Sequence, residues 1–167
     1  YKNEKKVKEM KSKIFIAEGN LKIHYYSNSK VFKPTRTSSL IIKAINKNKK
    51  KFNKKLNILD LGCGSGIIGI TLKKSVFKNA NICFSDFSKN SVKATKKSLA
   101  LNRLNCEVRK SNLMQNWKKK NFDLIINDVS GISSFFPKKN FWYNKFIPCD
   151  AGIDGTKQTF NFFKSLN

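Results

Sequence analysis

Hydrophobic and polar positions divide the chain into strand-like and helix-like segments. A continuous apolar run occupies residues 56–61, and apolar residues then recur at helical spacing over residues 67–72. The first pattern is typical of a strand buried on both faces, and the second is typical of a helix. Three alternating glycines, Gly62, Gly64 and Gly66, lie between them. This order of strand, glycine turn and helix predicts the first βα unit of a nucleotide-binding fold.

Further strands and helices follow the glycine turn. Residues 81–87 and 122–129 are apolar enough for buried strands, and residues 106–110 suit a short one. Residues 88–102 predict a helix capped by Ser88, with an inner face formed by Val92, Leu99 and Ala100. Alternating strands and helices indicate a parallel sheet with helices on both faces. We therefore predict an α/β fold with a Rossmann-like, doubly wound sheet.

The first 55 residues are expected to form a lead-in to this sheet. Residues 13–26 contain two alternating runs around Glu-Gly-Asn, which predicts a β-hairpin. Pro34 ends the second run, and Thr37 or Ser38 can cap the helix that follows. Residues 1–13 suggest a basic helix or a frayed end. We expect residues 1–55 to hold these elements and residues 56–167 to form the core.

Charge leaves two interpretations open. The chain has 35 basic and 10 acidic residues, a formal net charge of +25. Such an excess indicates a nucleic-acid or ribosomal partner, because lysine and arginine neutralise phosphates. Only Arg36, Arg103 and Arg109 are arginines, however, and a surplus of lysine, asparagine and isoleucine is also what an AT-rich genome produces.

The cysteines and the apolar runs exclude two other classes of protein. The four cysteines are widely scattered along the sequence: Cys63, Cys83, Cys106 and Cys149. His24 is the only histidine that could join them as a metal ligand, so we expect reduced thiols and no metal site. No apolar run approaches the roughly 18 residues of a membrane span, and the first residues lack a signal's apolar centre. We expect a cytoplasmic protein.

The spacing of acids and glycines indicates which class of nucleotide ligand the fold binds. Asp86 ends the second predicted strand, where a doubly wound fold places an acid against ribose hydroxyls. Residues 64–69 fit the dinucleotide pattern GxGxxG, but Asp60, Gly62 and Cys63 precede them, so the turn begins earlier. An earlier turn favours an adenosine-containing ligand without a pyrophosphate.

Three segments carry a family resemblance: ILDLGCGSGIIGI, FSDFSKNSVKATKKSLALN and FDLIIND. They resemble motifs I, II and IV of the class I S-adenosylmethionine-dependent methyltransferases. VFKPTRTSS and DAGIDGTKQTFNFF are similar to segments of the small-domain group that contains the release-factor and ribosomal-protein glutamine methyltransferases. The resemblance implies methyl transfer to nitrogen or oxygen on protein or RNA of the translation apparatus. Because the superfamily core usually has seven strands and we find four, we expect a sheet incomplete in its C-terminal half.

The resemblance also implies which residues hold S-adenosylmethionine. Asp86 would hold the ribose hydroxyls, Asn112 would face the adenine, and Asp60 would lie near the methionine part. The expected cofactor-binding residues are Asp60, Gly62, Cys63, Gly64, Gly66, Asp86, Phe87, Asn112 and Leu113. Two of these residues have structural alternatives, since Asp60 can cap the turn and Asp86 can start a helix.

The fourth motif departs from the family pattern. The amino methyltransferases carry N-P-P-[YF], whereas residues 127–131 read NDVSG, with Asp128 in the Asn place. We expect Asp128 to position the acceptor, with a helix-capping or surface role as the alternative. The missing motif favours a rival function, a non-catalytic module that binds ribosomal RNA or protein. A dinucleotide oxidoreductase is disfavoured by the early turn. The aromatic run at residues 135–146 suits either base stacking or a pocket cover.

Overall fold

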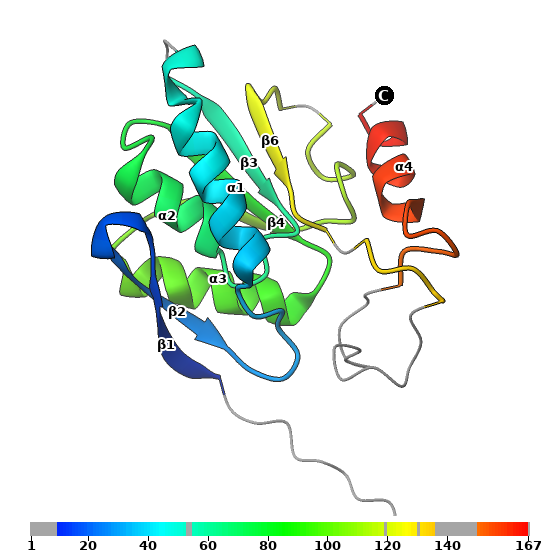
Figure 1. Cartoon of the computed structure of the whole chain (residues 1–167), viewed down its shortest axis with the longest axis horizontal. Helices are drawn as coiled ribbons and strands as arrows, with labels where there is room; N and C mark the ends of the chain where they lie inside the picture. The colour runs from blue at the N-terminus through cyan, green and yellow to red at the C-terminus, as the bar shows by residue number, and fades with distance from the viewer. Residues whose placement is uncertain (1–9, 53–54, 119, 130, 136–149, 167) are drawn as a thin grey trace, which may run out of the picture.

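A four-stranded parallel sheet forms the centre of the structure, which is a computed structural model (Figure 1). It describes residues 10–52, 55–118, 120–129, 131–135 and 150–166. The strands lie in the order β5-β4-β3-β6 and are β3 (Asn57–Leu61), β4 (Asn81–Asp86), β5 (Val108–Lys110) and β6 (Leu124–Asn127). The α/β prediction and its four strands are thus confirmed. Within the described residues, β6 pairs along its length with β3 alone.

The two faces of the sheet have different covers. Helices α1 (Arg36–Lys47), α2 (Ile67–Ser75) and α3 (Lys89–Leu101) contribute to a core that includes Ile58, Ile82 and Ile126. The opposite face carries a second cluster with α4 (Lys157–Lys164) and the segment after β5; its buried members are Leu59, Leu61, Cys83, Met114, Trp117 and Phe162. Helices therefore lie on both faces. None of the described helices is long and apolar enough to span a membrane.

The predicted hairpin is confirmed and packs on α3. Strands β1 (Lys11–Ile16) and β2 (Lys22–Ser27) are antiparallel and flank a short 3-10 turn, η1 (Glu18–Asn20). The Tyr26 N–H donates to Ser98 Oγ at 2.9 Å. Strand β1 begins at Lys11, so residues 11–13, at the end of the predicted basic helix, form strand and not helix. Residues 1–9 lie outside the described residues.

Two local predictions about helices need correction. Ser88 caps α3 as expected, but its inner face is Ser91, Ala94, Thr95, Ser98 and Leu99, while Val92 is half-buried and Ala100 is exposed. Small hydroxyl side chains fit there because they bond backbone carbonyls; Thr95 donates to the Gly64 carbonyl at 3.1 Å. Helix α1 begins one residue after Thr35, whose N–H donates to Ser38 Oγ, so Thr35 is the N-cap instead of Thr37 or Ser38. A 3-10 turn, η2 (Lys49–Lys51), follows it.

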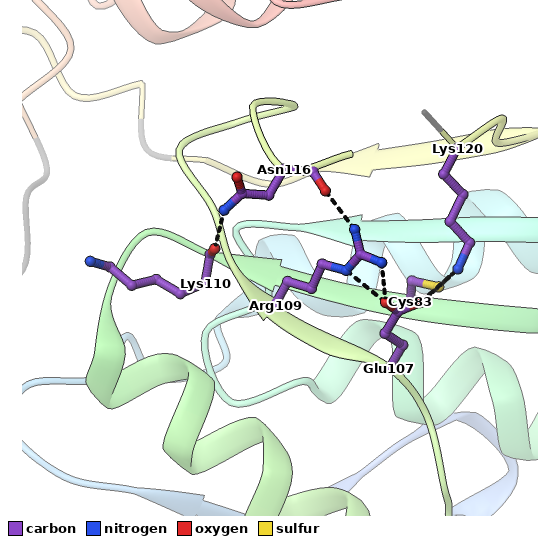
Figure 2. Close-up of polar contacts among 6 residues, drawn as sticks. All are labelled: Cys83, Glu107, Arg109, Lys110, Asn116 and Lys120. Atoms are coloured by element: carbon purple, nitrogen blue, oxygen red, sulfur yellow. Dashed lines mark hydrogen bonds and ion pairs between the residues drawn. The ribbon is translucent and has the colours of Figure 1, made fainter. Parts of the chain in front are cut away.

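An ionic network fastens the segment after β5 to the edge of the sheet (Figure 2). Glu107 binds the Arg109 guanidinium at 2.5 Å and the Lys120 ammonium at 2.7 Å. Arg109 also donates to the Asn116 carbonyl at 2.6 Å and stacks 4.3 Å from the centre of the Trp117 ring. Lys120 lies 3.2 Å from the Cys83 sulfur. The network therefore holds both ends of the loop that contains Asn112.

Candidate active site

The glycine turn after β3 requires glycine at the expected positions. Gly62, Gly64 and Gly66 all have positive φ, between 56° and 81°. A Cβ on Gly62 would lie 2.8 Å from Val129 Cγ1, and one on Gly66 would lie 3.0 Å from Thr95 Cγ2. Side chains there would strain the backbone and push β6's loop and α3 away. The turn after β3 is therefore in close contact with Val129, in the loop after β6, and with Thr95 of α3.

Asp86 ties this turn to the start of α3. One carboxylate oxygen accepts from the Gly64 N–H at 2.9 Å, and the other accepts from the Ser88 N–H at 2.8 Å. Burial raises the pKa of Asp86, and these two bonds oppose the rise. Because a carboxylate offers about four lone-pair sites, Asp86 retains acceptor capacity for a ligand. The structural and ligand-binding roles are thus compatible.

Asp60 lies beneath the turn and not on its surface. It is 1% exposed and accepts a hydrogen bond from the Gly69 N–H at 2.8 Å, in the first turn of α2. Burial raises its pKa to about 7, and the charges of Asp128 and Asp86 add to the rise. A Cβ on Gly69 would lie 2.4 Å from the Phe84 ring, so glycine lets α2 approach the strand. The charges of Asp128 and Asp86 therefore add to burial in opposing the ionisation of Asp60.

A cavity of about 860 Å³ opens at the carboxyl ends of the strands. The expected site residues that line it are Gly62, Cys63, Gly64, Asp86, Phe87, Asn112, Leu113 and Asp128. Asp60 and Gly66 are not among the lining residues and support it from behind. The volume lies within the range of small-molecule sites, and an open α/β sheet binds ligands at this edge.

The cavity lining carries charges of both signs, among them Lys33, Arg36, Asp86 and Asp128, and its thiol is not reactive. Burial, together with the charges of Asp86 and Asp60, holds the pKa of Cys63 well above its usual range. Cys63 is therefore a neutral thiol, 3.3 Å from Thr95 Oγ1, and not a nucleophile. Burial also raises the pKa of Asp128. Apart from the masked positions, no group of three or more metal-ligating side chains is found.

Several lining residues were missed from the sequence. Lys33 and Arg36 come from the entry to α1, and Gln158 and Asn161 come from α4. The glycine-rich stretch DAGIDGT predicts the start of α4, and helical spacing along that helix is the signal that places Gln158 and Asn161 near each other. Most of the aromatic run at residues 135–146 lies outside the described residues, and Phe135 is exposed.

Comparison with known proteins agrees with this geometry. The model of the family described as methyltransferase small domain matches residues 24–128. Ribosomal RNA small subunit methyltransferase C of Haemophilus influenzae is 41% identical over 71 residues, 42% of this chain and 21% of that protein. Ribosomal protein L11 methyltransferase of Lactobacillus johnsonii is 36% identical over 77 residues, 46% of this chain and 24% of that protein. The chain thus spans less than a quarter of these relatives.

A solved structure shows the same fold. The 16S rRNA methyltransferase of T. thermophilus, in complex with AdoMet and guanosine, superposes with a TM-score of 0.61 at 21% identity. The match covers 70% of this chain and 32% of that one.

Proposed function

Because this chain belongs to the methyltransferase small domain family, we propose that it transfers a methyl group from S-adenosylmethionine to nitrogen or oxygen on RNA or protein of the translation apparatus. The observation that carries the proposal is the convergence of the glycine turn, Asp86 and Asp128 on one cavity. The names of the relatives support the acceptor class, since they are ribosomal RNA and ribosomal protein methyltransferases.

The residues present fit S-adenosylmethionine. Its sulfonium and ammonium charges suit this site, because Asp128 and Asp86 lie close enough to Asp60 for their charges to add to the rise that burial causes in the pKa of Asp60. Asp86 would hold the ribose hydroxyls, Asn112 and Leu113 the adenine, and Gly62 to Gly64 the methionine part. Phe87 is 59% exposed beside this position and supplies an apolar surface for the adenine ring. When bound, the cofactor supplies an electrophilic methyl group.

The chain's own contribution is orientation. Asp128 accepts a hydrogen bond from the acceptor and directs its lone pair towards the methyl group. The cavity walls hold the reactants in line, an effect worth up to roughly 7 to 11 kcal/mol in well-aligned systems. Asp60 acts indirectly, through its bond to α2, by holding the glycine turn.

The chain divides, in this proposal, into a core and a lead-in. Residues 56–167 form the cofactor-binding core, and residues 1–55 supply one wall of the cavity through Lys33 and Arg36. A reducing, cytoplasmic compartment suits the free thiols of Cys63, Cys83 and Cys106.

Labelled S-adenosylmethionine tests the proposal. The chain is incubated with it and a cell lysate, and RNA, protein and small molecules are then separated. Label in RNA or protein is expected. The rival function is a non-catalytic module that binds ribosomal RNA or protein. The feature that favours it is the sequence NDVSG at residues 127–131, in place of the family's N-P-P-[YF]. Cofactor binding with no transfer to any fraction would establish the rival.

A further inference from the structure

Helix α3 carries a row of cations on its solvent side. Lys89, Lys93 and Lys96 are all exposed, and each follows the one before it by four or three residues. Side chains at this spacing lie on one side of a helix, so the three lysines form a stripe along α3, which we call the lysine stripe. The buried face of α3 contains Ala94 and Ser98, so the stripe points away from the core.

The hairpin beside α3 widens this surface. The Asn102 side chain donates to the His24 carbonyl at 2.6 Å, and the Tyr26 N–H donates to Ser98 Oγ, so β2 is fastened along α3 (Figure 1). The Lys97 ammonium lies 5.0 Å from the centre of the Tyr26 ring and joins the lysine stripe to the hairpin. The exposed His24 lies two residues from Tyr26 and therefore on the same face of the strand.

No acidic side chain on these elements compensates the cations. Helix α3 and strands β1 and β2 contain neither aspartate nor glutamate. The acid of the hairpin turn, Glu18, accepts a hydrogen bond from Asn46 of α1 instead. Among the residues that the structure describes, no ion pair includes a lysine of α3. The lysine stripe therefore presents its charge to solvent.

Repulsion between these charges opposes the helix that carries them. Lys89 is the first residue of α3, where the positive end of the helix dipole disfavours a cation, and no acid lies in the first turn. Lys93 has a like charge four positions away on each side, at Lys89 and Lys97, and like charges at this spacing destabilise a helix. A bound polyanion would relieve both effects.

The form of the lysine stripe favours a nucleic-acid backbone over other anionic partners. Successive lysines lie about 6 and 4.5 Å apart along the helix axis, and a nucleic-acid strand carries one charge on every nucleotide. Protein interfaces centre on apolar and aromatic side chains, and the stripe contains none. A membrane-binding helix exposes a broad apolar face, whereas only Leu101 among the large apolar side chains of α3 is exposed.

We propose that the lysine stripe, flanked by Lys97 and His24, is a docking surface for the phosphate backbone of an RNA strand, outside the cavity. RNA is named because the proposed function concerns the translation apparatus. The stripe begins beside Ser88, which lines the cavity, so RNA bound along α3 would extend away from the cavity mouth. The inference goes beyond the proposed function, since it concerns how the chain is held on its target and not which group receives the methyl.

Two triple variants of equal net charge separate the lysine stripe from the overall charge of the chain. The stripe triple combines Lys89→Gln, Lys93→Gln and Lys96→Gln. The η2 triple removes three exposed lysines beyond the end of α1, by Lys49→Gln, Lys50→Gln and Lys51→Gln. Binding of a fluorescently labelled RNA strand is followed by anisotropy over a series of salt concentrations, without S-adenosylmethionine. Labelled polyglutamate is the second probe.

We expect the stripe triple to lower the slope of log affinity against log salt concentration by about 2 to 3, because each lost phosphate contact lowers it by about 0.7 to 0.9. The η2 triple should keep the wild-type slope. Replacing the lysines of the stripe by arginine should also keep it, because arginine retains the charge. The urea midpoint of the stripe triple should not fall, since the substitutions remove repulsion within α3.

Two results overturn the inference. Equal losses of slope in the stripe triple and the η2 triple would show that RNA binding follows the total charge of the chain. Binding of polyglutamate but not of RNA through the stripe would make an acidic polypeptide the partner. Because both measurements omit S-adenosylmethionine, either result leaves the label-transfer test of the proposed function untouched. Stripe-dependent RNA binding supports the inference even where no label is transferred.

Discussion

Replacing Asp60 by Asn should change how the stability of the protein depends on pH. Burial and the charges of Asp128 and Asp86 raise the pKa of Asp60 from 3.8 to about 7. The folded state therefore binds a proton more tightly than the unfolded state does, and stability falls as pH rises from about 4 through 7. A shift of about 3 units corresponds to about 4 kcal/mol. Asn keeps the acceptor for the Gly69 N–H but cannot ionise.

Urea unfolding from pH 4.5 to 8 measures this difference. Over this pH interval the free energy of unfolding of the wild type should fall by about 3 to 4 kcal/mol more than that of Asp60→Asn, because the variant removes this titration alone. A bound cation should favour the ionised form, so wild-type affinity for S-adenosylmethionine should rise through pH 7, and the variant should show a smaller rise. Parallel stability curves for the two proteins would refute the assignment of this titration to Asp60.

Three further changes test separate parts of the site. Asp86→Ala should weaken S-adenosylmethionine binding roughly 10- to 100-fold in calorimetry, the scale of hydrogen bonds to a charged group, and unchanged affinity would exclude the ribose role. Asp128→Asn should keep cofactor affinity and lower label transfer, whereas unchanged transfer would leave Asp128 structural. Gly69→Ala should lower the free energy of unfolding by about 1 to 3 kcal/mol, because its Cβ would lie 2.4 Å from the Phe84 ring; an unchanged urea midpoint would contradict this packing.

The strands and the glycine turn could be predicted because their signals are local. The buried run before Gly62 and the cap at Ser88 depend on residues a few positions apart, and the structure has both. The burial of Asp60 under α2 could not be predicted, since it depends on Gly69 and Phe84 meeting across the fold.

The amides of α4 illustrate the same limit. Their place in the cavity depends on Phe162 entering a cluster built from residues about 50 to 100 positions earlier in the sequence. The polar inner face of α3 was missed for a related reason, because Thr95 is buried by its bond to the Gly64 carbonyl and not by hydrophobicity.

Glu107 should give a pH dependence of the opposite sign to that of Asp60. Hydrogen bonds from Lys120 and then Arg109 lower the pKa of Glu107, so its contribution is present at neutral pH and is lost as pH falls through the folded-state value. Because the Glu107 side chain is 37% exposed, we expect Glu107→Gln to cost at most about 1 kcal/mol at pH 7 in low salt, and less in 1 M salt.

The larger effect of Glu107→Gln should be on the loop that Glu107 holds. Arg109 and Lys120 flank the segment that carries Asn112 (Figure 2), so losing their shared carboxylate should loosen that segment. Hydrogen exchange of residues 111–118 should accelerate while α2 stays protected, and S-adenosylmethionine affinity should fall a few-fold. Lys118→Gln, which leaves Glu107 in place, is the control. Uniform acceleration across the sheet would instead make Glu107 a contributor to global stability, with no particular link to the adenine side of the cavity.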